Sequence, residues 1–105
     1  MARINVEFND RKYIIEYNRR SIVKLMESQN EKDSEIESAV KIIYYGLYKN
    51  HSNDMPDMDD IYGWIIAMGE QLKPFVEALN GLIQDVLTTV KNEQENKGFK
   101  WGVVK

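Results

Sequence analysis

The chain has 105 residues, of which 43% are hydrophobic and 30% charged, and its formal net charge is −3. This length fits one domain, and the composition excludes a disordered tail. The chain has no cysteine, which excludes disulfides and thiolate sites and fits a reducing cytosol. No apolar run is long enough to span a bilayer, and the N-terminus lacks a signal-peptide pattern. We therefore expect a globular protein that stays in the compartment where it is made.

Two short stretches near the N-terminus place apolar residues at every second position. The first set is Ile4, Val6 and Phe8, and the second set is Tyr13, Ile15 and Tyr17. This period is typical of half-buried strands. Residues 9–11, Asn-Asp-Arg, tolerate turn conformations, so an antiparallel hairpin is the natural connection. Because a lone hairpin is marginal in water, we expect it to pack on helices.

The next two segments have helical spacing and recognisable start signals. Asn18 is a good N-cap for a helix of about nine residues, and Ser34 with Glu37 forms a capping-box pattern for a helix that ends near Lys49. The residues expected to face inward are Ile22, Val23 and Met26 in the first helix and Ile36, Val40, Ile43 and Leu47 in the second. The residues expected to face water are Arg19, Arg20 and Lys24.

A third and a fourth helix follow the loop at residues 51–56. Asp57 is the expected N-cap of the third helix, and Pro74 is expected in the first turn of the fourth. The expected apolar rows are Ile61, Trp64, Ile65 and Met68 in the third helix, and Phe75, Leu79, Ile83, Val86 and Val90 in the fourth. The predicted fold is therefore α+β: residues 1–96 form a two-stranded antiparallel hairpin on a bundle of about four helices, and residues 97–105 form a tail.

The charges are unevenly distributed along the chain. Residues 1–27 carry six Lys/Arg against four Asp/Glu, whereas residues 28–72 carry three against nine. The basic sector could contact phosphates, with Arg11, Arg19, Arg20 and Lys24 as the candidate residues. It could equally be the solvated side of the hairpin and first helix, and the acidic middle argues against wrapping nucleic acid. A small regulator that contacts nucleic acid is thus the second functional hypothesis.

No catalytic or metal-binding pattern stands out. The single histidine, His51, adjoins a serine in a predicted loop, and a surface histidine is the simpler interpretation. The stretch "DMPDMDD" is acidic, but Ile61 and Tyr62 occupy the places where a calcium loop needs a ligand and a glycine. Acids at these positions, like those in the first turn of the second helix, suit the positive end of a helix dipole. We predict a protein that is not an enzyme and has no cofactor or metal.

The densest aromatic cluster is "YYGLY" at residues 44–48. Tyr44 and Tyr48 lie one turn apart beside the apolar row, so core packing explains them. Tyr45 points about 100° away and is harder to bury. The candidate partner-binding residues, expected to form an exposed contact patch, are Tyr45, Trp64, Phe99 and Trp101, because aromatic side chains anchor interfaces out of proportion to their number. For each of them singly, core packing or chance exposure is the alternative interpretation.

The order of these motifs resembles a known family. The run "VEFNDRKYIIEYNRRSIVKLME", the stretch "IIYYGLYKNH" with a small residue and a histidine before a proline-containing loop, "MDDIYGWI" and the final "KGFKWGVV" are similar to the small tail assembly chaperones of phages and prophages of Firmicutes. The resemblance covers most of the chain. Gly63 and Gly69 depart from the stronger helix formers expected in the third helix.

The resemblance implies a non-enzymatic role in phage tail morphogenesis. Such chaperones are encoded just before the tape-measure gene and are thought to coat the long, hydrophobic, helical tape-measure protein until the tail tube polymerises around it. The implied partner is therefore the tape-measure protein, and the tail tube subunit and further copies of the chain are additional candidates. The implied location is the bacterial host cytoplasm, with no place in the mature virion. The family pattern transfers no established binding residues to this sequence.

Overall fold

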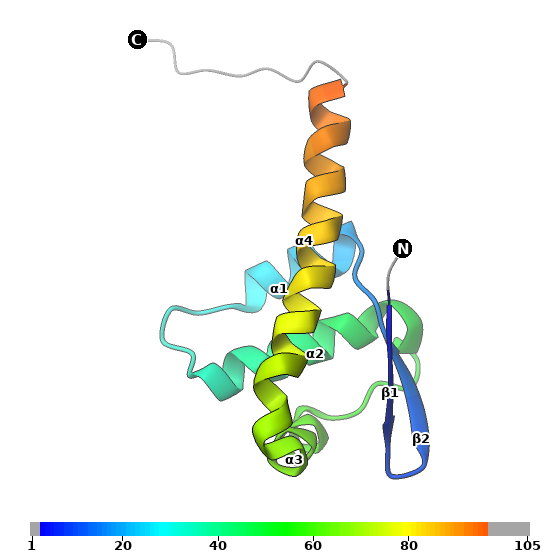
Figure 1. The fold of residues 1–105 in the computed structure, drawn as a ribbon, viewed down its shortest axis with the longest axis vertical. Coiled ribbons are helices and arrows are strands. Elements are labelled where there is room, and N and C mark those ends of the chain that lie inside the picture. The colour runs from blue at the N-terminus through cyan, green and yellow to red at the C-terminus, as the bar shows by residue number, and fades with distance from the viewer. Residues whose placement is uncertain (1–2, 97–105) are drawn as a thin grey trace.

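The computed structural model describes residues 3–96, with side chains for residues 3–89. It begins with the strands β1 (Ile4–Phe8) and β2 (Arg11–Ile15), which pair antiparallel with Val6 opposite Tyr13 (Figure 1). Asn9 and Asp10 between them have φ values of 51° and 64°. Asn and Asp tolerate this left-handed region, and two such residues in sequence make the tight turn that matches strand twist. The predicted hairpin is confirmed, although β2 ends two residues earlier than expected.

Helix α1 (Arg19–Ser28) begins at a reciprocal cap. The Ser21 amide donates to the Asn18 side chain at 2.8 Å, and the Asn18 amide donates to the Ser21 hydroxyl at 2.9 Å. The predicted N-cap is confirmed, but the predicted inward face is partly wrong, because the buried residues are Ser21, Ile22 and Leu25. The cap fixes the rotation of the helix about its axis. Val23 and Met26 each follow a buried residue, Ile22 and Leu25, by one position, which turns them about 100° away from the core and leaves them exposed.

The remaining helices are α2 (Glu35–His51), α3 (Met58–Met68) and α4 (Leu72–Asn96), with a 3₁₀ turn at Gly69–Gln71 before α4. Ser34 and Asp57 are the N-caps of α2 and α3, as predicted. Gly69 has a φ of 56°, so α3 ends at a residue in the left-handed region that glycine adopts without steric cost. Helix α4 begins slightly before the expected position and includes Pro74 in its first turn.

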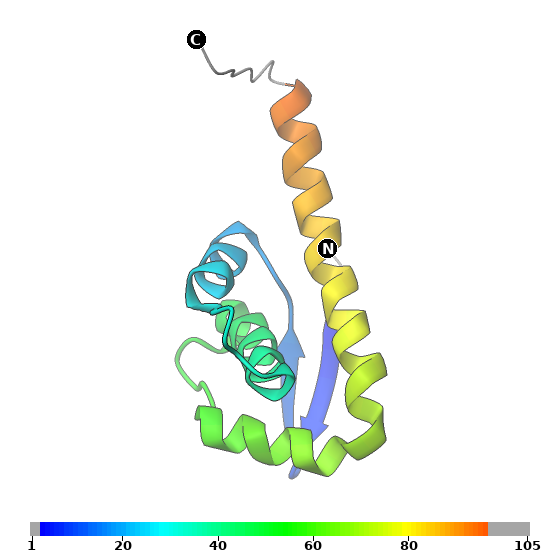
Figure 2. The same cartoon turned by 90° about the vertical axis from the view of Figure 1, so that its left-hand side faces the viewer.

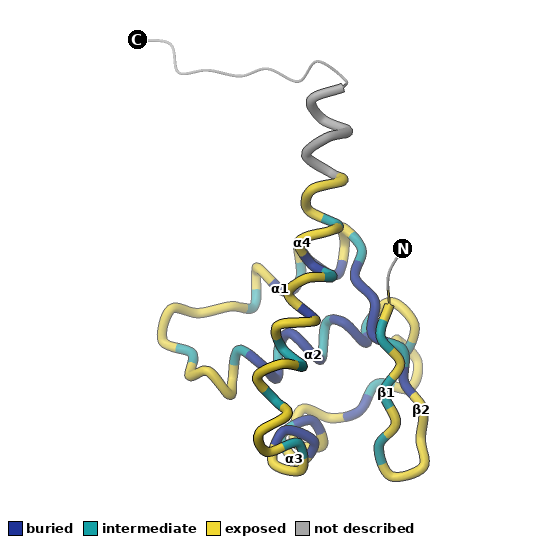
Figure 3. Tube along the Cα trace, in the orientation of Figure 1, coloured by how far each residue is buried: buried dark blue, intermediate teal, exposed yellow. Residues whose placement is uncertain are grey.

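The described chain is α+β, as predicted, but the helices form a bundle only in part. Helices α1, α2 and α3 pack together with the hairpin, and α2 contacts α1, α3 and β2. Helix α4 contributes Leu79 and Ile83 to the core, and its C-terminal part extends beyond the rest of the fold (Figure 2). Buried positions follow the middle of α2, and exposed positions gather at the hairpin turn (Figure 3). Residues 97–105, the predicted tail, lie outside the described residues.

The end of β2 crosses α2 at Gly46, where the two backbones meet. The Glu16 amide donates to the Gly46 carbonyl at 2.9 Å, and the Tyr17 hydroxyl donates to the Ile42 carbonyl at 2.6 Å. A Cβ on Gly46 would lie 2.5 Å from Cγ2 of Ile15 and 2.8 Å from the Tyr17 hydroxyl oxygen. Only glycine allows this close approach.

Polar side chains of α2 complete the contact with β2. Lys49 Nζ lies 2.6 Å from Glu16 Oε2, and the Asn50 side chain donates to Glu16 Oε1 at 3.3 Å. The Ile14 amide donates to His51 Nε2 at 2.9 Å. The outer edge of β2 is therefore bonded to α2 through the amides of Ile14 and Glu16.

Two glycines in helices should respond oppositely to alanine. Gly46→Ala should destabilise the fold by about 1–3 kcal/mol, because overpacking at the crossing outweighs the gain in helix propensity. Gly63→Ala should stabilise it by about 0.5–1 kcal/mol, because a Cβ there meets nothing within 4 Å. Urea denaturation followed by circular dichroism measures both changes. Equal effects of the two substitutions would contradict the proposed role of Gly46.

The Glu16–Lys49 pair should make stability depend on pH. The hydrogen bond from Lys49 lowers the pKa of Glu16 against the opposing effect of burial. Because the folded-state pKa lies below the unfolded value, this stabilisation is present above about pH 4.3 and is lost as pH falls through the folded pKa. Lys49→Met should therefore destabilise the fold at pH 7 by about 1–2 kcal/mol, after allowance for solvent screening of the partly exposed lysine, and by less at pH 3.

Urea denaturation at both pH values measures this difference. Glu16→Gln supplies the control background, in which Lys49→Met should have nearly the same effect at pH 7 and pH 3. A pH-independent effect of Lys49→Met in the natural sequence would show that the ion pair contributes nothing to acid sensitivity.

Candidate functional site

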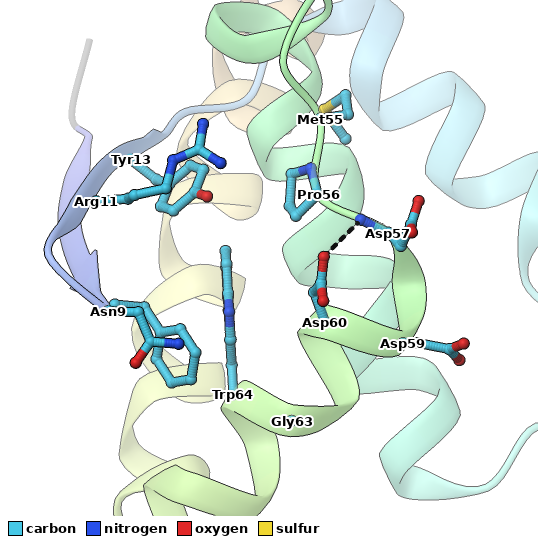
Figure 4. Close-up of a pocket in the computed structure, with 11 residues that line it drawn as sticks. Asn9, Arg11, Tyr13, Met55, Pro56, Asp57, Asp59, Asp60, Gly63 and Trp64 are labelled. Carbon is cyan, nitrogen blue, oxygen red and sulfur yellow. Dashed lines mark hydrogen bonds between the residues drawn. The ribbon is translucent and has the colours of Figure 1, made fainter.

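A cleft of about 550 Å³ lies between the hairpin turn and the start of α3 (Figure 4). Its lining residues are Phe8, Asn9, Arg11, Tyr13, Met55, Pro56, Asp57, Asp59, Asp60, Gly63 and Trp64. The Trp64 ring forms a wall of the cleft, with its centroid 5.3 Å from that of Phe8 and 5.0 Å from that of Tyr13. The cleft therefore has an aromatic wall and a polar rim.

Two charged groups of this cleft, Asp60 and Arg11, already have partners within the fold. The Asp57 amide donates to the Asp60 carboxylate at 3.3 Å, which is the helix-capping role predicted for these acids. The Arg11 guanidinium lies 5.4 Å from the Tyr13 ring centroid and 3.8 Å from the Asp54 carboxylate. This arrangement pairs no base with a nucleophile, and it offers capping and ion-pair contacts in place of a reaction centre.

A second hollow, of about 620 Å³, lies between the start of α2 and the start of α4. Ala39 and Ile42 are buried at its base, and Leu72 and Val76 are half-buried on the α4 side. Ile36 lines the opening and is 49% exposed, although the sequence predicted it in the core. Its position in the first turn of α2 lies beyond the part of the helix that α4 covers. We call this surface the α2/α4 groove.

A third hollow, of about 310 Å³, lies between β1 and the start of α4. Its lining is mainly apolar and consists of Val6, Glu7, Phe8, Trp64, Ala67, Met68, Gln71 and Phe75. Trp64 thus separates this hollow from the cleft at the hairpin turn. We call this surface the β1/α4 groove.

The two predicted partner-binding aromatics that the structure describes, Tyr45 and Trp64, do not share a surface. Tyr45 is half-buried, packs edge-on against Tyr44 at 5.1 Å, and lines a hollow of about 390 Å³ between α1 and α2. Trp64 is only 3% exposed, as its place in the expected apolar row of the third helix indicated, so its assignment to an exposed contact patch is wrong. β1, β2 and α3 enclose the ring on their shared core side. Phe99 and Trp101 lie outside the described residues.

The predicted basic residues are also separated. Arg11 begins β2 at the hairpin turn, whereas Arg19 and Arg20 begin α1 beyond the other end of that strand (Figure 1). Lys24 Nζ lies 5.3 Å from the Tyr48 ring centroid on the side of α1 that faces α2. Strand β2 therefore separates Arg11 from Arg19 and Arg20, so the four candidate residues do not form one continuous phosphate-binding surface.

His51 has a structural role that the sequence did not reveal. It ends α2, its side chain is largely buried, and its Nε2 accepts the Ile14 amide while Nδ1 lies 3.3 Å from the Asp54 carboxylate. The sequence predicts that this helix ends near Lys49 and that His51 lies in a loop. Because α2 continues to His51, its side chain reaches β2, and the predicted loop gave no sign of this contact. Among residues 3–89, no group of three or more His, Cys, Asp or Glu side chains could hold a metal ion. None of the described helices is both long and apolar enough to cross a membrane.

Comparison of the chain with known protein families, with curated proteins and with solved structures finds no match.

Proposed function

We propose that this protein is a tail assembly chaperone that binds the helical tape-measure protein in the host cytoplasm during phage tail morphogenesis. The sequence motifs resemble that family, and the α2/α4 groove is the observation that carries the proposal. The groove presents the exposed side chain of Ile36 together with Leu72 and Val76. Exposed apolar side chains beside a hollow are a feature of protein-binding sites.

The groove suits a helical partner. A helix satisfies its own backbone hydrogen bonds, so it needs mainly an apolar surface for its own apolar residues at i, i+3, i+4 and i+7. The α2/α4 groove offers such a surface, and Glu35, Lys73 and Glu77 supply a polar rim. Each fully buried aliphatic side chain contributes roughly 1.5–3 kcal/mol, so a few anchors suffice for binding.

A binding role fits the polar groups better than catalysis does. Two shielded carboxylates, those of Glu16 and Asp33, pair with Lys49 and Lys41, and the Tyr17 hydroxyl donates a hydrogen bond to a backbone carbonyl. Hydrogen bonding to Lys41 lowers the pKa of Asp33, and burial raises the pKa of Tyr17. These contacts stabilise the fold and leave the groups unavailable for proton transfer near neutral pH.

Co-expression tests the proposal. The chain should keep the tape-measure protein encoded next to it soluble and should co-purify with it. Ile36→Glu and Val76→Glu should each reduce co-purification at least tenfold, because a charge would be buried against the client. The matched control is Ile66→Glu on α3, which lies outside the groove and is 81% exposed; it should behave like the natural sequence. An insoluble client, or groove variants that co-purify normally, would refute the proposal.

A further inference from the structure

The outer edge of β1 has backbone groups that no described residue pairs with. A two-residue turn makes Phe8 and Arg11 a hydrogen-bonded pair, so the pairs Val6–Tyr13 and Ile4–Ile15 also exchange hydrogen bonds. The amides and carbonyls of Asn5 and Glu7 must then point away from β2. Within the part of the chain that the structure describes, no other backbone or side-chain group bonds to them.

The other edge of the hairpin is closed. By the same alternation, the outward amides of β2 belong to Lys12, Ile14 and Glu16, and the last two donate to His51 and Gly46 of α2. An exposed strand edge is a template for another strand, and proteins commonly cover or charge it. In this hairpin, α2 covers the edge of β2 and leaves the edge of β1 open.

The β1/α4 groove lies beside this open edge. Figure 2 shows β1 on the side of the hairpin that faces α4. A strand added to β1 would direct alternate side chains towards the half-buried Met68 and Phe75. The site thus specifies an extended segment with apolar residues at every second position, which is recognition by strand addition.

The chain contains a segment of this composition. In the stretch "GFKWGVVK", Phe99, Trp101 and Val103 alternate with Lys100 and Gly102. Aromatic and β-branched residues favour strands. We propose that residues 99–103 of one copy add to the open edge of β1 in a second copy, with Phe99, Trp101 and Val103 filling the β1/α4 groove.

The length of α4 requires the second copy. Phe75 lines the groove, and α4 carries the chain away from it to Asn96, roughly 30 Å at 1.5 Å per residue. Val103 is seven residues beyond Asn96 and can return at most about 25 Å. The segment therefore cannot fill the groove around Phe75 of its own chain.

Self-association of the full chain tests this inference, with the edge and the segment altered separately. Glu7→Pro removes one outward amide and no hydrogen bond to β2, and edge strands tolerate proline at such positions. Glu7→Ala is the matched control. Trp101→Asp alters the segment alone. Analytical ultracentrifugation should show a concentration-dependent oligomer for the natural chain and for Glu7→Ala. The association constant should be at least tenfold lower for Glu7→Pro and for Trp101→Asp.

Mixing the two defective variants gives the sharper result. Trp101→Asp keeps an intact β1 edge, and Glu7→Pro keeps an intact segment 99–103. In an equimolar mixture, the segment of Glu7→Pro should therefore bind the edge of Trp101→Asp and form a heterodimer, whereas each variant alone should associate weakly. In the natural chain, hydrogen exchange at the Asn5 and Glu7 amides should slow as the concentration rises, and in Trp101→Asp it should not. A monomeric natural chain, a Trp101→Asp variant that associates normally, or a mixture without heterodimer would overturn the inference.

Circular dichroism and hydrogen exchange at the Ile14 amide test whether Glu7→Pro is folded. If Glu7→Pro does not fold, Asn5→Pro replaces it, with Asn5→Ala as the control. The inference does not rest on the chaperone proposal. If Ile36→Glu loses client binding but self-associates like the natural chain, the α2/α4 groove and the edge of β1 act independently.

Discussion

The close approach of β2 to α2 at Gly46 is the contact on which the rest of the fold depends. Because residue 46 has no side chain, Ile15 and Tyr17 pack directly on the helix, and the Tyr17 hydroxyl reaches the carbonyl of Ile42. The Glu16 amide bonds to the carbonyl of Gly46 at the same place. Hydrogen bonds in a buried site hold orientation as well as distance. The crossing therefore fixes the hairpin on α2, and the Asn18 cap immediately after it fixes the rotation of α1.

This crossing also determines which surfaces remain open. One edge of the two-stranded sheet is bonded to α2 by Ile14 and Glu16, so among residues 3–96 the outward backbone groups of β1 are left unpaired. On α2, the end of the hairpin bonds to Ile42, Gly46 and His51, from the middle of the helix to its C-terminal end, while Ile36 in the first turn is exposed. The open edge and the exposed start of α2 are two consequences of one packing arrangement.

The sequence predicted the elements well because their signals are local. The alternation in the hairpin, the turn residues Asn9 and Asp10, and the caps Asn18, Ser34 and Asp57 each act within a few residues. It did not predict the exposure of Val23, Met26 and Ile36, because periodicity identifies an apolar stripe but not which part of it a distant helix covers. The partners of Gly46 and His51 depend on contacts between segments far apart in the chain, which no local pattern encodes.

The two open surfaces differ in what they demand of a ligand. The α2/α4 groove is lined by residues of two helices, whose backbone groups beyond the first turn bond within the helix, so a ligand there must satisfy most of its own hydrogen bonds, as a helix does. The edge of β1 offers donors and acceptors at Asn5 and Glu7, so a ligand there gains by being extended. A helix would leave those groups unpaired, and an extended segment in the α2/α4 groove would lose its own hydrogen bonds to water without replacement, at a cost for each unpaired group. Backbone hydrogen bonding therefore favours a helical ligand in the α2/α4 groove and an extended ligand at the edge of β1.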